Sequence, residues 1–221
     1  MPVAIITGAS SGIGRAASIL LAKNGYALSL TGRNSGALEE VANLCKQQGA
    51  PQINSAGILK AGPVLESGIE VYDELMNVNV RSLIRLTRAA LPHIISQKGT
   101  VVNVSSINGP CPFPGVTYYC MSKSAVDQFT KCLALEMAPN GVRVNAVCPG
   151  VTVTNLHKTS GQNEATYQAF LERSKTTHAL GRPGKSEEVA EAILFLASEK
   201  SSFTTGQLLR VDGGRGIMHP R

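Results

Sequence analysis

The chain has 221 residues, of which 43% are hydrophobic and 16% charged, which is typical of one α/β domain with a sizeable core. The formal net charge is +6, but lysines and arginines are scattered and no run resembles a nucleic-acid-binding arm. Its five cysteines form no C-x-x-C pair and share no metal-ligand spacing with histidines, which predicts free thiols, a reducing compartment and no metal. The apolar run 3–6 is too short for a signal peptide or a membrane span, so we expect a cytosolic protein without a membrane or nucleic-acid partner.

The first part of the chain alternates between strand and helix patterns. Residues 3–6 predict a buried strand, a glycine-rich turn covers 7–14, and a helix follows over 15–24. A second strand is predicted over 27–31 and a second helix over 36–48, ending at Gly49. This alternation predicts a doubly wound parallel sheet.

The remainder of the chain continues the same alternation. Helices are predicted over 71–96, with an interruption at Pro92, over 118–138, and over 186–198, with Ser186 as N-cap. Strands are predicted over 99–104, 142–147 and 207–211. Residues 155–183 are polar with a short helical pattern around 165–174, and we interpret them as a substrate lid on a single domain that spans 1–221.

Tyr119 and Lys123 stand four residues apart on a predicted helix, so they share one face of it. An ammonium beside a phenol favours the phenolate and lowers a pKa that is otherwise about 10. Ser106, thirteen positions before Tyr119 at a strand end, could offer a second hydroxyl to the same substrate oxygen. In isolation such a pair is more typical of a helix surface, but together the three residues indicate carbonyl or alcohol chemistry.

The first turn carries glycines with separate physical uses. Gly8 permits a tight turn, Gly12 lets the backbone approach a pyrophosphate, and Gly14 lets the helix pack close to the sheet. The helix N-terminus behind them offers free N–H groups and a positive dipole end. A glycine turn alone is a weak signal, but its position after the first strand favours nucleotide binding.

Several motifs occur in a fixed order along nearly the whole chain: Thr7-Gly8-x-x-x-Gly12-x-Gly14, Asn54-Ser55-Ala56-Gly57, Asn79, Ser106, Tyr119-x-x-x-Lys123 and Pro149-Gly150. This series resembles the short-chain dehydrogenase/reductase family. The pattern is similar to the 3-oxoacyl-carrier-protein-reductase-like and carbonyl-reductase-like members, which have a one-domain Rossmann fold.

The resemblance implies a role for each catalytic position. Tyr119 would be the general acid that protonates the carbonyl oxygen as hydride arrives, and the base in the reverse direction. Lys123 would lower the pKa of Tyr119 and hydrogen-bond the nicotinamide ribose, while Ser106 would hold and polarise the substrate oxygen. Asn79 would hold a water that links Lys123 to solvent.

The resemblance also implies a nicotinamide cofactor, whose carboxamide would be clamped near Thr152 and Thr154. Residues 31–34, at the end of the second strand, lack the carboxylate that would accept from a ribose 2′-OH. Arg33 offers a bidentate partner for a 2′-phosphate instead, so NADP(H) is preferred over NAD(H). The implied cofactor-binding residues are Gly8, Ser10, Ser11, Gly12, Ile13, Gly14, Arg33, Asn54, Ala56, Gly57, Tyr119, Lys123, Pro149, Gly150, Thr152 and Thr154.

The chain departs from the family pattern before Asn54. Only residues 49–53 separate the second helix from Asn54, where the family has a third strand, a helix and a fourth strand, a unit of about 30 residues. We therefore expect a sheet that lacks the third strand, its helix and most of the fourth strand, so that the first strand loses a neighbour. Five residues that include Pro51 are a poor substitute for a central strand. A genuine deletion and an omission of residues from this sequence both remain open.

Two hypotheses about function follow. The first is an NADPH-dependent reductase of ketones or 3-oxoacyl compounds, with an apolar substrate wall around 111–116 and, by resemblance, a dimeric or tetrameric assembly. The second, motivated by the missing segment, is a catalytically silent family member that binds protein partners.

Overall fold

The computed structural model describes residues 2–45, 52–154, 156 and 163–218. These residues form a parallel sheet of six strands in the order β2-β1-β3-β4-β5-β6. The predicted doubly wound α/β architecture is confirmed. The strands are β1 (Val3–Thr7), β2 (Ala27–Thr31), β3 (Gln52–Asn54), β4 (Thr100–Val104), β5 (Arg143–Pro149) and β6 (Leu208–Val211).

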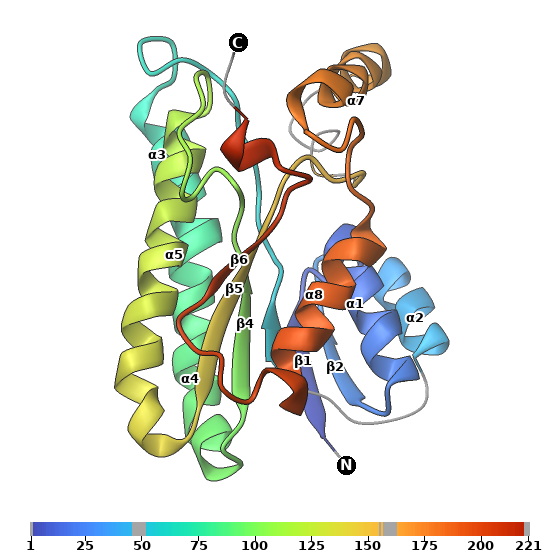
Figure 1. Cartoon of the computed structure of the whole chain (residues 1–221), viewed down its shortest axis with the longest axis vertical. Helices are drawn as coiled ribbons and strands as arrows, with labels where there is room; N and C mark the ends of the chain where they lie inside the picture. The colour runs from blue at the N-terminus through green and yellow to red at the C-terminus, as the bar shows by residue number, and fades with distance from the viewer. Residues whose placement is uncertain (1, 46–51, 155, 157–162, 219–221) are drawn as a thin grey trace.

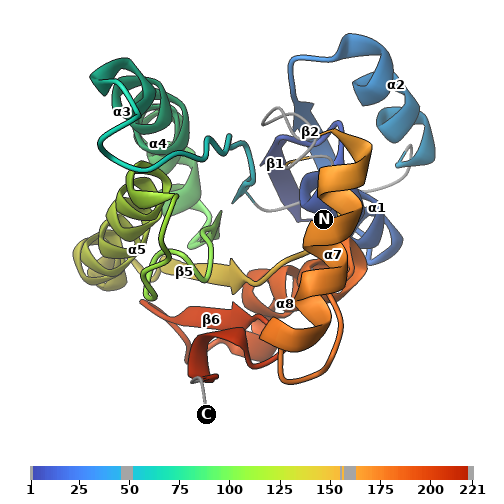
Figure 2. The same ribbon diagram turned by 90° about the horizontal axis from the view of Figure 1, so that it is seen from above.

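Helices cover both faces of the sheet (Figure 1). One layer holds α1 (Gly12–Lys23), α2 (Ser35–Leu44) and α8 (Ser186–Ala197), and the other holds α3 (Ile69–Leu75), α4 (Ser82–Ser96) and α5 (Thr117–Met137). Figure 2 shows the two layers on either side of the sheet, with α7 (Glu164–Thr177) above the layer of α1 and α8. No helix among these residues is long and apolar enough to cross a membrane.

The main core lies between the sheet and the α1–α8 pair. Its fully buried side chains include Ile6, Leu21, Ile53, Ile193 and Leu196. Burial of an aliphatic side chain of this size contributes about 1.5–3 kcal/mol. These five residues come from β1, α1, β3 and α8, so their burial joins these elements. Ile53 of β3 therefore stabilises the junction between the two halves of the sheet.

The centre of the sheet shows the predicted loss of most of the fourth strand. β3 occupies the place between β1 and β4, with Ile6 opposite Ile53, Thr7 opposite Asn54, and Asn54 opposite Asn103. This prediction is confirmed, because a strand of only three residues remains there and keeps a neighbour for the carboxyl end of β1. The predicted shortage is real, since β3 pairs with only Ile6 and Thr7 of β1 and β2 stands at the edge of the sheet.

Several element boundaries differ from those predicted. The helix predicted over 71–96 consists of α3, a π-helical stretch η1 (Met76–Arg81) and α4, which contains Pro92. α2 ends at Leu44, and the predicted helix end at 48–49 lies outside the described residues. Ser186 is the first residue of α8 rather than its N-cap, and its hydroxyl donates to the carbonyl of Val153.

Candidate functional site

The strand order reverses between β1 and β3, because the chain goes from β1 outward to β2 and then returns to the other side of β1. At such a switch point the loops after the two central strands separate and leave a crevice for a ligand at the carboxyl ends. The glycine turn follows β1, and residues 54–57 follow β3. Both predicted cofactor motifs therefore lie at the position where this topology places a nucleotide.

The glycine turn has the backbone that its residues require. Gly8 has φ +63° and Gly12 has φ +52°, a left-handed region that side chains other than glycine rarely adopt. A Cβ at Gly14 would collide with the carbonyl of Gly8, so α1 begins in direct contact with the turn. Ser11 is the N-cap of α1, and its side chain makes no capping bond. The first N–H groups of α1 can thus serve an anion.

The remaining predicted residues of this region lie close to the turn. Ile13 is part of the first turn of α1 and packs against the main core. The Ser10 hydroxyl lies near Gly32, at the end of β2, and Arg33 is exposed in the next position. Asn34 then begins α2 by accepting from the N–H of Ala37 at 3.0 Å. Arg33 is therefore held at the carboxyl edge between β2 and α2.

The short strand β3 delivers its loop to the turn through a few polar contacts. The Thr7 hydroxyl oxygen accepts from the N–H groups of Ser55 and Ala56, each at 3.0 Å. The Asn54 amide donates to Oδ1 of Asn103 at 2.9 Å. A Cβ at Gly8 would lie 3.0 Å from the Ala56 nitrogen, so the two loops are in contact. These hydrogen bonds hold the loop after β3 in place, a role that the backbone pairing of a longer strand would otherwise have.

Tyr119 and Lys123 lie on the buried face of α5, with 5% and 6% of their surface exposed. The Lys123 ammonium donates to the carbonyl of Val104 at 3.0 Å and lies 5.7 Å from the centroid of the Tyr119 ring. A Cβ at Gly57 would lie 3.6 Å from Lys123 Nζ, so the loop after β3 passes directly over the lysine. The predicted catalytic pair is thus assembled next to the predicted cofactor loop.

Ser106 follows β4 and faces the tyrosine. Its hydroxyl is hydrogen-bonded to Tyr119, donates to Oδ1 of Asn108 at 3.2 Å and accepts from the Asn108 N–H at 3.1 Å. The Ser105 hydroxyl instead donates to the carbonyl of Lys123 at 3.4 Å, as the alternation of strand neighbours predicts. Asn108 was not expected from the sequence, although its position two residues after Ser106 allows this local bond.

Asn79 lies in the π-helical stretch, a feature frequent at functional sites. Its Oδ1 accepts from the Ile58 N–H at 2.8 Å, and its amide donates to the Ile58 carbonyl and to the Ser122 hydroxyl, both at 3.0 Å. The side chain therefore ties η1 to the loop after β3 and to α5. The water that the resemblance assigns to Asn79 stays a prediction.

The pKa values correct one expectation. Burial raises the pKa of Tyr119 to about 12, and the hydrogen bond to Ser106 acts in the opposite direction. The expected lowering by Lys123 is therefore wrong for this structure, because desolvation of the phenol dominates and the ammonium bonds to Val104. Burial also lowers the pKa of Lys123 to about 8, and the charge of Asp127 is the first effect that opposes this lowering.

The segment after β5 closes the other side of the crevice. The Gly150 N–H donates to the Val211 carbonyl at 3.0 Å, while the Pro149 carbonyl accepts from Ile107 N–H at 2.9 Å. Thr152 pairs with Gly184. A Cβ at Gly12 would lie 3.2 Å from Cγ2 of Thr154. The clamp segment and the glycine turn thus meet across the carboxyl edge of the sheet.

His178 is a buried histidine that contacts the segment after β5. It is 3% exposed, and its Nε2 accepts from the Val151 N–H at 3.1 Å. Burial lowers its pKa. Its neutral ring therefore fixes the backbone of the clamp segment, and only the tertiary structure places it there.

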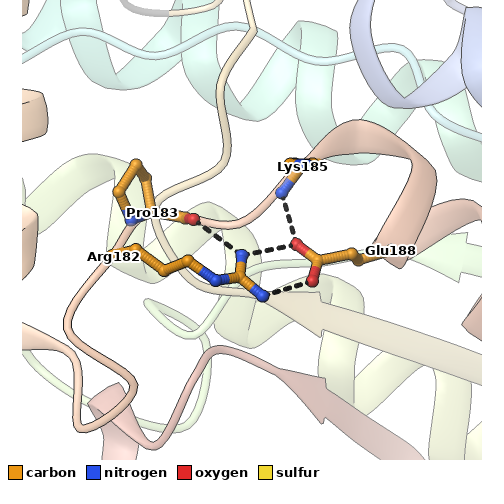
Figure 3. A network of polar contacts seen from close by, with 4 residues as sticks. All are labelled: Arg182, Pro183, Lys185 and Glu188. Atoms are coloured by element: carbon orange, nitrogen blue, oxygen red, sulfur yellow. Dashed lines mark hydrogen bonds and ion pairs between the residues drawn. The ribbon is translucent and has the colours of Figure 1, made fainter.

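Part of the predicted substrate lid, residues 155 and 157–162, lies outside the described residues. Between α7 and α8, a polar network joins Arg182, Pro183, Lys185 and Glu188 (Figure 3). Arg182 pairs with both carboxylate oxygens of Glu188 at 2.9 and 2.6 Å and donates to the Pro183 carbonyl at 3.1 Å. Glu188 also accepts from the Lys185 N–H at 2.7 Å, and these bonds lower its pKa to about 2. The network holds the residues around Gly184, and with them the partner of Thr152.

A parallel sheet with a glycine turn at its switch point, and a buried serine, tyrosine and lysine beside that turn, defines a Rossmann-type protein. A family model described as short chain dehydrogenase matches residues 2–53, and one described as Enoyl-(Acyl carrier protein) reductase matches residues 52–215. The chain belongs to the short-chain dehydrogenase/reductase family, whose members are NAD(P)-dependent oxidoreductases acting on alcohols and carbonyl compounds.

Individual relatives support this assignment. The chain is 36% identical to 3-oxoacyl-[acyl-carrier-protein] reductase FabG of Thermotoga maritima over 96% of both sequences. It is 39% identical to meso-2,3-butanediol dehydrogenase of Serratia marcescens over 73% of this chain and 62% of that one. A short-chain dehydrogenase/reductase of unknown function from Caenorhabditis elegans, solved with cofactor, superposes with a TM-score of 0.91, at 31% identity over 99% of this chain and 96% of that one. ElxO with NADP bound gives a TM-score of 0.87, at 25% identity over 99% of this chain and 100% of that one.

The comparisons also locate the shortage of residues. The two family matches meet at residues 52–53, which is where β3 begins. The alignment with the Thermotoga protein spans 244 positions, more than the 221 residues of this chain. That relative therefore has residues that this chain lacks.

Proposed function

We propose that the protein is an NADP(H)-dependent oxidoreductase that reduces the carbonyl group of a ketone or 3-oxoacyl compound to an alcohol. The observation that carries the proposal is the buried arrangement of Ser106, Tyr119 and Lys123 beside Gly57 and the nucleotide crevice. Relatives named as a 3-oxoacyl reductase and a butanediol dehydrogenase support this chemistry.

The residues around the crevice fit a nicotinamide dinucleotide. Gly8 and Gly12 keep the turn free of side chains, the N-terminus of α1 suits the pyrophosphate, and Thr152 and Thr154 lie opposite for the carboxamide. The bound cofactor would supply the hydride. Arg33, exposed where β2 ends, would pair with a 2′-phosphate, which favours NADP(H).

The protein's own residues would supply the proton and the orientation. Ser106 and Tyr119 would both donate hydrogen bonds to the carbonyl oxygen, and the proton would pass from the Tyr119 hydroxyl to that oxygen. Burial raises the pKa of Tyr119 to about 12, so the phenol is protonated at neutral pH and holds the proton that the reduction needs. Asn108 holds the Ser106 hydroxyl in place, and Lys123 would contact the nicotinamide ribose.

The segment 111–116, predicted from the sequence as an apolar substrate wall, contacts residues 215–217. The Arg215 guanidinium lies 4.8 Å from the centroid of the Phe113 ring, and the Cys111 thiol contacts the Gly216 carbonyl at 3.7 Å. The short helix η4 (Arg215–Ile217) thus packs against the 111–116 segment. We propose that this wall and the lid over 155–183 select a hydrophobic carbonyl compound.

The proposal also covers assembly and location. The family resemblance implies a dimer or tetramer, and we propose that this chain forms one through α4 and α5. A measurement of molecular mass in solution that gives only monomer would contradict this. The cytosolic location stays a prediction.

The Tyr119→Phe variant tests the chemistry. Loss of a general acid typically costs about 100-fold or more in rate, so we expect the variant to lose NADPH oxidation against ketones, diketones and 3-oxoacyl thioesters while it still binds NADPH. Tyr118→Phe is the matched control, because Tyr118 packs against Tyr72 and should leave turnover intact. Unchanged turnover in Tyr119→Phe would refute the assigned acid, and absence of NADPH binding by the wild type would favour the silent partner-binding alternative.

A further inference from the structure

Asp127 lies one helical turn beyond Lys123 on α5 and is buried, with 5% of its surface exposed. Its Oδ2 is a buried polar atom without a hydrogen-bond partner among the described residues. Such atoms are rare in folded proteins, because each loses hydration without compensation. Oδ2 occupies the space beside Gly109, where a Cβ would collide with it.

Burial raises the pKa of Asp127, and the elements around it provide few groups that could compensate the charge of its carboxylate. From β5, the Cys148 thiol donates to Oδ1 at 4.0 Å. After β4, Ser105 acts to lower the pKa of Asp127, while its hydroxyl donates to the Lys123 carbonyl. On α5 itself the cations that act on it are Lys123, which is buried, and Lys131, which is exposed. From β6, Arg210 acts on the neighbouring Cys148. Of the cations that act on the Asp127 carboxylate, Lys123 is therefore the buried one.

Lys123 is a buried cation, just as Asp127 is a buried acid. Its ammonium is buried and its hydrogen bond goes to the neutral carbonyl of Val104. Desolvation disfavours the charged form, and the charge of Asp127 is the first effect that opposes it. A carboxylate and an ammonium at positions i and i+4 of a helix are neighbours, and the low dielectric of a buried site strengthens their interaction.

We propose that Asp127 is a positioning residue whose carboxylate keeps Lys123 protonated in the buried site. The role of Lys123 in turnover rests on the proposed function, but the charge coupling itself does not. In this arrangement Tyr119, Lys123 and Asp127 occupy successive turns of one face of α5. The proposed acid Tyr119, the cation Lys123 and the carboxylate of Asp127 thus lie in one row along α5.

The test is a pH titration of Lys123 in the wild type and in Asp127→Asn. NMR of ¹⁵N-labelled lysine side chains monitors the protonation of Lys123. We expect Lys123 to lose its proton at a pH lower by about one unit in the variant, as for removal of a close opposite charge. The alkaline limb of the carbonyl-reduction profile should move down by the same amount. Glu136→Gln removes an exposed carboxylate from the same helix and should move neither. An unchanged Lys123 titration in Asp127→Asn would overturn the proposal.

The titration needs no substrate, so it separates this inference from the proposed function. A wild type without turnover would refute the proposed function and leave the NMR result to decide on Asp127. If Asp127→Asn does not fold, ¹³C NMR of aspartate carboxyl groups in the wild type at pH 7 gives the answer. An ionised Asp127 supports the proposal, and a protonated one overturns it.

Discussion

The two halves of the sheet hold their loops in place by different means. The predicted catalytic half of the sheet consists of β4, β5 and β6. There β4 pairs along its length with β5, and every residue of β4 is buried. The predicted cofactor half consists of β2, β1 and β3. There β3 has three residues, and Val3, at the start of β1, is 67% exposed. Strand pairing positions Ser106, whereas a few side-chain bonds position residues 54–57. The difference teaches that a functional loop needs its anchors more than it needs a full-length strand.

The largest expected effect is on stability, at the centre of the shortened half. Ile53→Ala removes a fully buried side chain from the main core, and such truncations cost about 2–5 kcal/mol of unfolding free energy. Because domains are stable by only about 5–15 kcal/mol, a denaturant titration should show a clear loss. Leu44→Ala, at an exposed position of α2, is the control. A loss below about 1 kcal/mol would mean that β3 hardly contributes.

The anchor between the halves is expected to have the next largest effect. Thr7→Val keeps the shape of the side chain but removes the acceptor for the Ser55 and Ala56 N–H groups. Leaving these donors without a partner costs about 1–3 kcal/mol, and the displaced loop should also weaken NADPH binding. Thr31→Val, at the end of β2, provides the comparison. Equal NADPH affinity in the two variants would show that the Thr7 anchor is dispensable.

Discrimination between cofactors is expected to change by a smaller amount. Arg33→Ala should weaken NADPH binding about tenfold and leave NADH binding nearly unchanged, since a charge-assisted hydrogen bond to a phosphate is worth about 1.5–3 kcal/mol at most. Fluorescence titrations with both cofactors measure the ratio. Arg15→Ala, which removes another arginine of the same half, controls for net charge. Equal losses for both cofactors would argue against a 2′-phosphate contact.

The smallest effect on stability is expected for the ion pair between Arg182 and Glu188. The pKa of Glu188 lies at about 2, below its ordinary value of 4.5, so the ionised carboxylate stabilises the fold above that ordinary value. This contribution is lost as the pH falls from 4.5 toward 2. Glu188→Gln should therefore lower the thermal midpoint slightly at pH 7, within the range of an exposed ion pair, and the difference should shrink toward pH 2. A difference that grows on acidification would contradict this sign.

The sequence predicted what depends on local pattern. The turn around Gly8 and Gly12 requires glycine for its backbone, and Tyr119 and Lys123 share a helix face by spacing alone, so these features could be inferred. β3 could not, because its three residues form a strand only by pairing with β1 and β4. The burial of His178 and the raised pKa of Tyr119 likewise arise from segments far apart in the chain.

The central claim is that the shortened cofactor half still serves a complete catalytic half. Its most direct test is an NADPH titration of the wild-type protein, followed by carbonyl-dependent NADPH oxidation in the same preparation. We expect saturable binding with a Kd of about micromolar magnitude, together with turnover of a hydrophobic ketone or 3-oxoacyl compound. A protein that is folded by circular dichroism but binds neither NADPH nor NADH at about millimolar concentration would contradict the claim.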